Sequence, residues 1–262
     1  MRKHAFTLIE LLVVVSIIAL LVAILLPAVH NARLRAKEAI CMSDMRSLSQ
    51  ASLVYAVDSQ GLLPDLTIKK SADIINPKAS DASPQVYWAF TYWRLLFENN
   101  YGIQRDQWYS PTAEDWNLDK LYWWIDGTKV GSDTTSTYTV IGRMYMTSLK
   151  GNGLDAATSH MFNYLIDPLP DSAWPLFPRR LSDRTHWSLM WADLNRELHS
   201  YTPGHIDWSI SYDTRIGASH LYGSVHEKPA GTHEAFIDGS GKFVTGEEFQ
   251  PRSAQPGITF WW

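Results

Sequence analysis

The first 29 residues decide the fold: Met1-Arg-Lys-His-Ala-Phe-Thr-Leu-Ile-Glu10, then Leu-Leu-Val-Val-Val-Ser-Ile-Ile-Ala-Leu20, then Leu-Val-Ala-Ile-Leu-Leu-Pro-Ala-Val29. An apolar run extends from Phe6 to Val29 and is interrupted by Thr7, Glu10, Ser16 and Pro27. An α-helix rises ~1.5 Å per residue, so about 20 apolar residues cross the hydrocarbon of a bilayer. The run therefore predicts a membrane-spanning helix over residues 6–29.

Two ordinary segments compete with this interpretation, a cleaved secretory signal peptide and a plain signal anchor. A signal peptide has a shorter apolar core followed by small residues at its cleavage site, and Pro27-Ala-Val-His-Asn-Ala32 offers no such site. A plain anchor leaves Glu10 unexplained. A charged group costs about 2.5–3.5 kcal/mol at the centre of a membrane helix and less near an end, so such a residue indicates a function.

Residues 5–14, Ala5-Phe-Thr-Leu-Ile-Glu10-Leu-Leu-Val-Val14, resemble the cleavage and methylation signal of type IV prepilins and type II secretion pseudopilins. The resemblance implies a leader of residues 1–5, cleavage between Ala5 and Phe6 by a prepilin peptidase, and N-methylation of the new Phe6 amine by an N-methyltransferase. A glutamate at the fifth position of the mature chain, here Glu10, is characteristic of the family. Ala5 stands where the family usually has glycine, and the small difference in size implies slower rather than abolished processing.

The same resemblance implies a location and a set of partners. The expected protein crosses the inner membrane once, with a cytoplasmic N-terminus and a periplasmic or extracellular head, and then enters a pilus-like filament. Its expected partners are the peptidase, other pilin-like subunits, the inner-membrane assembly platform and membrane lipid. Arg2 and Lys3 favour this orientation, whereas Arg33, Arg35 and Lys37 oppose it, so it rests mainly on the resemblance.

Pro27 lies where the family carries a proline, which permits bending or melting of the helix when subunits pack in a filament. The resemblance thus makes Glu10 and Pro27 the candidate filament-assembly residues. Proline removes one helical hydrogen bond and kinks or ends a helix. A simple terminator at the membrane exit is therefore the alternative for Pro27.

The helix is expected to continue as an amphipathic segment over residues 30–60, because no glycine or proline occurs from Ala28 to Val57. One stripe has helical spacing: Cys41, Met45, Leu48, Ser52 and Tyr55. Gly61 and Pro64 then end the helix. Cys41, the single cysteine, lies too late for lipid attachment after the apolar core. We expect it to be a small apolar residue packed under the head rather than a reactive thiol.

Two further segments are similar to the pilin-like proteins of planctomycetes and related bacteria. The first starts at Cys41-Met-Ser-Asp44-Met-Arg-Ser-Leu48 and runs to Gly61-Leu-Leu-Pro64. The second comprises His226, Gly231 and Phe236-Ile-Asp-Gly239. Ser240 stands where that family usually has a further histidine, so any role of that histidine is absent.

Residues 61–262 are expected to form a globular head of α+β class, an antiparallel sheet laid on the helix in the manner of pilins. The expected elements are a loop over 65–85, a buried helix from Tyr87 to Phe97 ending at Asn99-Asn100, a strand from Thr134 to Met146, a proline-rich loop from Pro168 to Pro178, a strand from Trp187 to Ala192 and a final edge strand from Ile258 to Trp262. Residues Asn117 to Val130 are ambiguous. Asp238-Gly239 between apolar runs predicts a hairpin.

The composition argues against several other functions. A net charge of -4 disfavours a broad nucleic-acid-binding face, and one cysteine excludes an intrachain disulfide. Six histidines lie between positions 186 and 233, at 186, 199, 205, 220, 226 and 233, but none forms a tight metal-binding pair. The sequence also has no Gly-x-Ser-x-Gly motif and no glycine-rich phosphate loop. We therefore expect no metal ion, cofactor or catalytic residue.

The sequence thus predicts a structural subunit, either a pseudopilin of a type II secretion system or a minor pilin of a type IV pilus-like filament. The alternative is a membrane-tethered module that binds surface polysaccharide or DNA, and an exposed row among the 12 tryptophans would favour it. An exported enzyme is a third class. His and Asp side chains that converge in one pocket would favour the enzyme.

Overall fold

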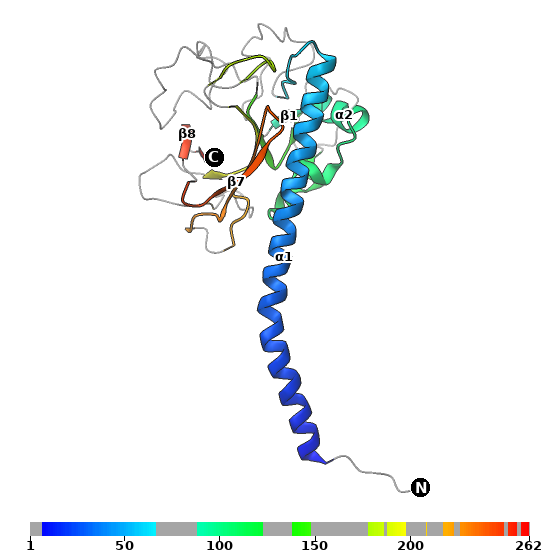
Figure 1. The fold of residues 1–262 in the computed structure, drawn as a ribbon, viewed down its shortest axis with the longest axis vertical. Helices are drawn as coiled ribbons and strands as arrows, with labels where there is room; N and C mark the ends of the chain where they lie inside the picture. The colour runs from blue at the N-terminus through cyan, green and yellow to red at the C-terminus, as the bar shows by residue number, and fades with distance from the viewer. Residues whose placement is uncertain are drawn as a thin grey trace. The chain divides into compact units, whose positions relative to one another are not determined.

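The computed structural model describes residues 7–66, 88–122, 138–147, 178–185, 188–197, 208, 217–222, 226–248, 251–255 and 258–261 (Figure 1). The chain divides into two compact units, Met1–Ile40 and Cys41–Trp262. The first unit contains the whole apolar run, residues 6–29. Its helix is the one candidate membrane span among the described residues, by length and composition.

Helix α1 extends from Leu8 to Asp58, is 51 residues long and contains Pro27. The predicted long helix is therefore confirmed, and the interpretation of Pro27 as a helix terminator is wrong. The helix ends where two residues adopt left-handed backbone conformations, Gln60 at φ 57° and Gly61 at φ 82°. The Gly61 N–H donates to the Ala56 carbonyl at 2.7 Å. Glycine accepts this conformation without steric cost, so the predicted end of the helix is also confirmed.

The second unit is an α+β structure with short helices between its strands. Its helical elements are α2 (Thr91–Asn100), α3 (Asp119–Tyr122) and the 3-10 turns η2 (Arg105–Trp108) and η3 (Glu114–Trp116). Its strands are β1 (Trp88–Phe90), β2 (Tyr138–Val140), β3 (Arg143–Tyr145), β4 (Leu189–Asp193), β5 (Arg196–Glu197), β6 (Gly231–Phe236), β7 (Gly241–Thr245), β8 (Pro251–Gln255) and β9 (Ile258–Trp261).

All the described strand pairs are antiparallel, in sheets of order β1-β2, β3-β4-β6-β7 and β5-β9-β8. The predicted hairpin is confirmed as β6–β7. Gly239 takes a left-handed φ of 81° at its turn, and the Ser240 N–H donates to Asp238 Oδ1 at 2.8 Å. The predicted strand at Trp187 to Ala192 is confirmed from Leu189 onward as β4, which ends at Asp193; Trp187 itself lies outside the described residues.

The C-terminal part of α1 supplies one wall of the core of this unit, beside α2 and the sheet that contains β7 (Figure 1). Four positions of the predicted stripe, Cys41, Met45, Leu48 and Ser52, are fully buried. The Trp191 indole N–H of β4 donates to Ser52 Oγ at 3.1 Å. The ring of Tyr55 meets Trp93 of α2 edge-on, with centroids 5.4 Å apart. The stripe therefore packs on the head as its spacing predicts.

Three predictions about secondary structure need correction. Residues 88–90 form strand β1 rather than the start of a helix, because they pair with β2 and the Phe90 N–H donates to the Leu66 carbonyl at 2.8 Å. The single strand predicted from Thr134 to Met146 is broken at Ile141-Gly142 into β2 and β3. A Cβ at Gly142 would lie 3.2 Å from Tyr109 Cα, so the chain passes closely there. The last strand, β9, is central rather than an edge, because it pairs with both β5 and β8.

Several predictions lie outside the described residues. These are most of the loops over 65–85 and Pro168 to Pro178, the segment after Tyr122, and the histidines at 186, 199 and 205.

Candidate functional site

The N-terminal signal begins outside the described residues, which start at Thr7, so Ala5 and Phe6 have no structural description. Thr7 and Glu10 form a reciprocal hydrogen-bonded pair at the start of α1. The Glu10 N–H donates to Thr7 Oγ1 at 3.2 Å, and the Thr7 N–H and hydroxyl both donate to Glu10 Oε2 at 2.8 Å. This is a capping box, which satisfies amide groups that have no intrahelical partner. The Thr-x-x-Glu spacing is the sequence signal for this role, which our sequence interpretation of Glu10 missed.

Pro27 lies inside α1 at the far end of the apolar run. Proline has no N–H, so the carbonyl of Ala23, four residues earlier, lacks its usual helical donor. The helix is therefore weakened near this point even though it continues.

A second, unpredicted site lies in the Cys41–Trp262 unit, where four side chains with metal-ligand chemistry converge. They are Cys41 from α1, Asp193 at the end of β4, His220 from the loop before β6, and His233 in β6. One ligand atom from each lies within 4.8 Å of all the others, and all four residues are buried. We call these four residues the buried cluster.

The shortest contacts of the cluster join Asp193 and the two histidines to one another. Asp193 Oδ2 lies 2.9 Å from His220 Nε2 and 3.0 Å from His233 Nδ1, and these two ring nitrogens are 2.9 Å apart. The His233 backbone N–H also donates to Asp193 Oδ2 at 2.9 Å. On the other side of the carboxylate, the Cys41 thiol donates to Oδ1 at 3.3 Å.

Arg143 of β3 lies against the cluster and is itself fully buried. It stands opposite Asp193 in the β3–β4 register, so the two form a cross-strand ion pair. Its guanidinium also donates to Cys41 Sγ at 2.9 Å and to the Tyr109 carbonyl at 3.1 Å. A second carboxylate, Asp44 of α1, lies 3.8 Å from it.

Burial and charge act in opposite directions on Asp193. Burial alone would raise the pKa of this carboxyl, but Arg143 and the hydrogen bonds from the two histidines hold the pKa well below its usual range. Burial raises the pKa of the Cys41 thiol to about 12 against the opposing effect of Arg143. Near neutral pH Asp193 is therefore ionised and Cys41 is a thiol.

The surroundings of Cys41 match the sequence prediction only in part. It is buried, as predicted, but its neighbours are Asp193, Arg143 and Ser110 rather than purely apolar groups. The expectation of no metal-ligand set rested on the absence of tight histidine pairs, whereas the fold brings together residues from four separate segments. His226 and Asp238 belong to the segment that resembles the planctomycete proteins. Both are exposed, and neither is part of the cluster.

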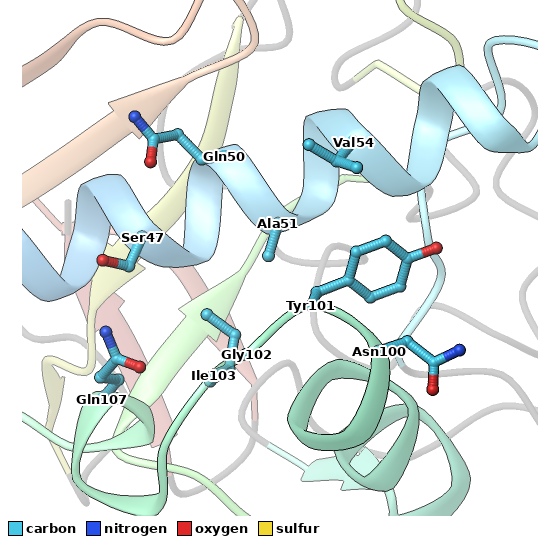
Figure 2. A pocket seen from close by; sticks show the side chains of 9 residues that line it. All are labelled: Ser47, Gln50, Ala51, Val54, Asn100, Tyr101, Gly102, Ile103 and Gln107. Carbon is cyan, nitrogen blue, oxygen red and sulfur yellow. The ribbon is translucent and has the colours of Figure 1, made fainter.

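A surface pocket of about 420 Å³ lies elsewhere on the same unit, between α1 and the residues that follow α2 (Figure 2). Its lining is mostly neutral and hydrogen-bonding: Ser47, Gln50, Ala51, Val54, Asn100, Tyr101, Gly102, Ile103 and Gln107. The lining has no carboxylate, histidine or cysteine, so the chemistry of the buried cluster is not available there.

Comparison with known proteins adds one match. Residues 1–26 match the family model described as the prokaryotic N-terminal methylation motif. No curated protein and no solved structure matches the chain. The chain therefore carries a type IV prepilin-like signal that overlaps the start of a helix of membrane-spanning length, and α+β structure follows this helix in the sequence, as in a pilin-like fold.

Proposed function

We propose that this chain is a structural subunit, a pseudopilin or a minor pilin, of a type II secretion or type IV pilus-like filament. The observation that carries the proposal is the methylation motif over residues 1–26, placed on a helix of membrane-spanning length. In this proposal a prepilin peptidase cuts between Ala5 and Phe6, and the Phe6 amine is then methylated. Before assembly the subunit lies in the inner membrane with its N-terminus in the cytoplasm. The assembly platform then transfers it into the filament.

Glu10 has two roles in this proposal, one before assembly and one after it. In the isolated chain it caps α1 through Thr7. In the filament, membrane helices pack into an apolar bundle where an unpaired charge is costly. Glu10 of one subunit then pairs with the Phe6 amine of its neighbour. A buried ion pair adds little stability over an apolar pair, so its main effect is to fix the axial register of the subunits.

Two substitutions separate these roles. Glu10→Val removes both the cap and the charge, whereas Glu10→Gln keeps a side chain that serves in a capping box but carries no charge. We expect both variants to insert into the membrane and to be cleaved after Ala5, and both to be lost from sheared filaments, as measured by immunoblotting of the filament fraction. A Gln variant that assembles like the parent would show that Glu10 acts only as a cap. Failure of cleavage would assign Glu10 to peptidase recognition.

Pro27 contributes flexibility in the same proposal. The missing hydrogen bond to the Ala23 carbonyl lowers the cost of bending or melting α1 locally when subunits pack. Pro27→Ala restores this bond, and we expect it to reduce filament incorporation without changing membrane insertion.

The alternative functions receive less support. A sugar-binding platform needs exposed tryptophans, but the six Trp side chains whose burial is described, at positions 93, 108, 116, 191, 208 and 261, are all buried. An enzyme needs acid–base groups that a substrate can reach. His and Asp do converge in the buried cluster, but the exposed fractions of Asp193 and His220 are 0% and that of His233 is 3%. This burial suits a structural role.

A further inference from the structure

We propose that Cys41, Asp193, His220 and His233 bind one zinc ion, which fastens the C-terminal part of α1 to the sheet of the head. The four ligand atoms are Cys41 Sγ, Asp193 Oδ2, His220 Nε2 and His233 Nδ1. They come from a helix, two adjacent strands and a loop, so a single ion would join segments that are distant in the sequence. The proposal does not depend on the function proposed above.

Protons alone cannot account for the contacts among Asp193, His220 and His233. Asp193 Oδ2, His220 Nε2 and His233 Nδ1 form a triangle with sides of 2.9, 2.9 and 3.0 Å. With Asp193 ionised in its pair with Arg143, each histidine contact to Oδ2 needs a proton on the ring nitrogen. The contact between the two nitrogens needs one of them to be bare. No placement of protons makes all three contacts hydrogen bonds. A single cation, in contrast, can accept a lone pair from each of the three atoms.

The spacing and the types of the four ligands suit a zinc ion. Zinc bonds to nitrogen and oxygen are about 2.0–2.1 Å long, so two such ligands of a tetrahedral ion lie about 3.3 Å apart. The triangle needs to open by only a few tenths of an ångström to reach this spacing. Cys41 Sγ lies 3.6 Å from Asp193 Oδ2 and supplies the fourth ligand. Thiolate with imidazole selects zinc over magnesium or calcium, which prefer all-oxygen sites.

The residues around the cluster orient the ligands. The ring nitrogen of His220 that faces away from the cluster, Nδ1, lies 3.0 Å from the Tyr222 hydroxyl. The backbone N–H of His220 donates to Thr112 Oγ1 at 3.1 Å. In the zinc-bound state a proton on Nδ1, donated to the Tyr222 hydroxyl, would leave Nε2 bare and facing the ion, as in most metal-binding histidines. His220 also holds an unusual left-handed φ of 55°. Such strain persists only where the surroundings fix it.

Charge balances when the ion binds. Zinc displaces the thiol proton of Cys41, which passes to solvent, and the resulting thiolate and the Asp193 carboxylate offset the two charges of the ion. Arg143 keeps its place behind the ligands, where it donates to Cys41 Sγ and pairs with Asp193 Oδ1 and with Asp44. The arrangement therefore provides both the ligands and the hydrogen bonds that support them.

The test uses the full chain extracted in detergent and purified through a tag that contains no histidine. After incubation with zinc and removal of free metal, elemental analysis should find one zinc per chain. Loading with cobalt instead should give the visible bands of a tetrahedral ion and a thiolate-to-metal charge-transfer band. Cys41→Ser, His220→Asn and His233→Asn should each lower the zinc content at least tenfold, and Cys41→Ser should remove the charge-transfer band. His226→Asn, at an exposed histidine of the same unit, is the matched control and should retain the zinc.

Two results would overturn the proposal. One is parent protein that is folded by tryptophan emission yet binds less than one zinc per ten chains, or gives a cobalt spectrum without the thiolate band. The other is unchanged zinc content in the cluster variants. Either result would leave the four residues as a buried hydrogen-bond network. The parent measurements decide the matter even where a variant fails to fold.

Discussion

Leu48→Ala tests whether the C-terminal part of α1 belongs to the core of the head. Leu48 is fully buried within that core. The substitution removes three carbon groups at about 0.8 kcal/mol each, or about 2.4 kcal/mol of transfer free energy. The cavity that remains raises the typical cost of such changes to about 2.7–5.0 kcal/mol. We expect a loss of about 3 kcal/mol, a large part of the roughly 5–15 kcal/mol that stabilises a typical protein.

The assay is urea unfolding of the detergent-solubilised chain, followed by the emission of buried tryptophans such as Trp191. The matched control is Val57→Ala, because Val57 lies on the same helix with 72% of its surface exposed. This control should change the free energy of unfolding by no more than about 0.5 kcal/mol. Equal effects of the two substitutions would refute the reasoning, since they would show that α1 contributes no buried face to the head.

Three further predictions concern the same unit. Ser52→Ala leaves the Trp191 indole N–H without its acceptor, so it should lower the free energy of unfolding in urea by about 1–3 kcal/mol. The control Ser47→Ala, at a less buried serine of the same helix, should have a much smaller effect. Gly239→Ala places a side chain at φ 81° and should cost about 1–2 kcal/mol; an unchanged midpoint would contradict the turn assignment. A fragment starting near Ala32 should be soluble and monomeric and should melt cooperatively with blue-shifted tryptophan emission; red-shifted emission quenched by sugar would instead favour the binding module.

The long helix and the hairpin could be predicted because their signals are local. The stripe from Cys41 to Ser52 follows the helical repeat, and an Asp-Gly pair between apolar runs demands a tight turn. The break at Gly142 and the central position of β9 could not be predicted in the same way, because both depend on segments that are distant in the sequence. Gly142 passes close to Tyr109. Strand β9 is central because β5 and β8 pair with it.

The buried cluster was missed for a related reason. Its members are separated by 152, 27 and 13 positions along the chain, as the pairs Cys41–Asp193, Asp193–His220 and His220–His233 show. A rule based on closely spaced ligands cannot detect such a set. A usable signal was present in Arg143, a charged residue within an otherwise β-branched and apolar strand, because a buried charge requires a partner of opposite sign.

The proposed filament subunit must be processed at its N-terminal signal. The direct measurement is the intact mass of the membrane-extracted protein from cells with an active prepilin peptidase, together with tandem mass spectrometry of its N-terminal peptide. We expect a chain that lacks residues 1–5, begins at Phe6 and carries one added methyl group on its amine. A chain that retains residues 1–5 in those cells would contradict the proposed function.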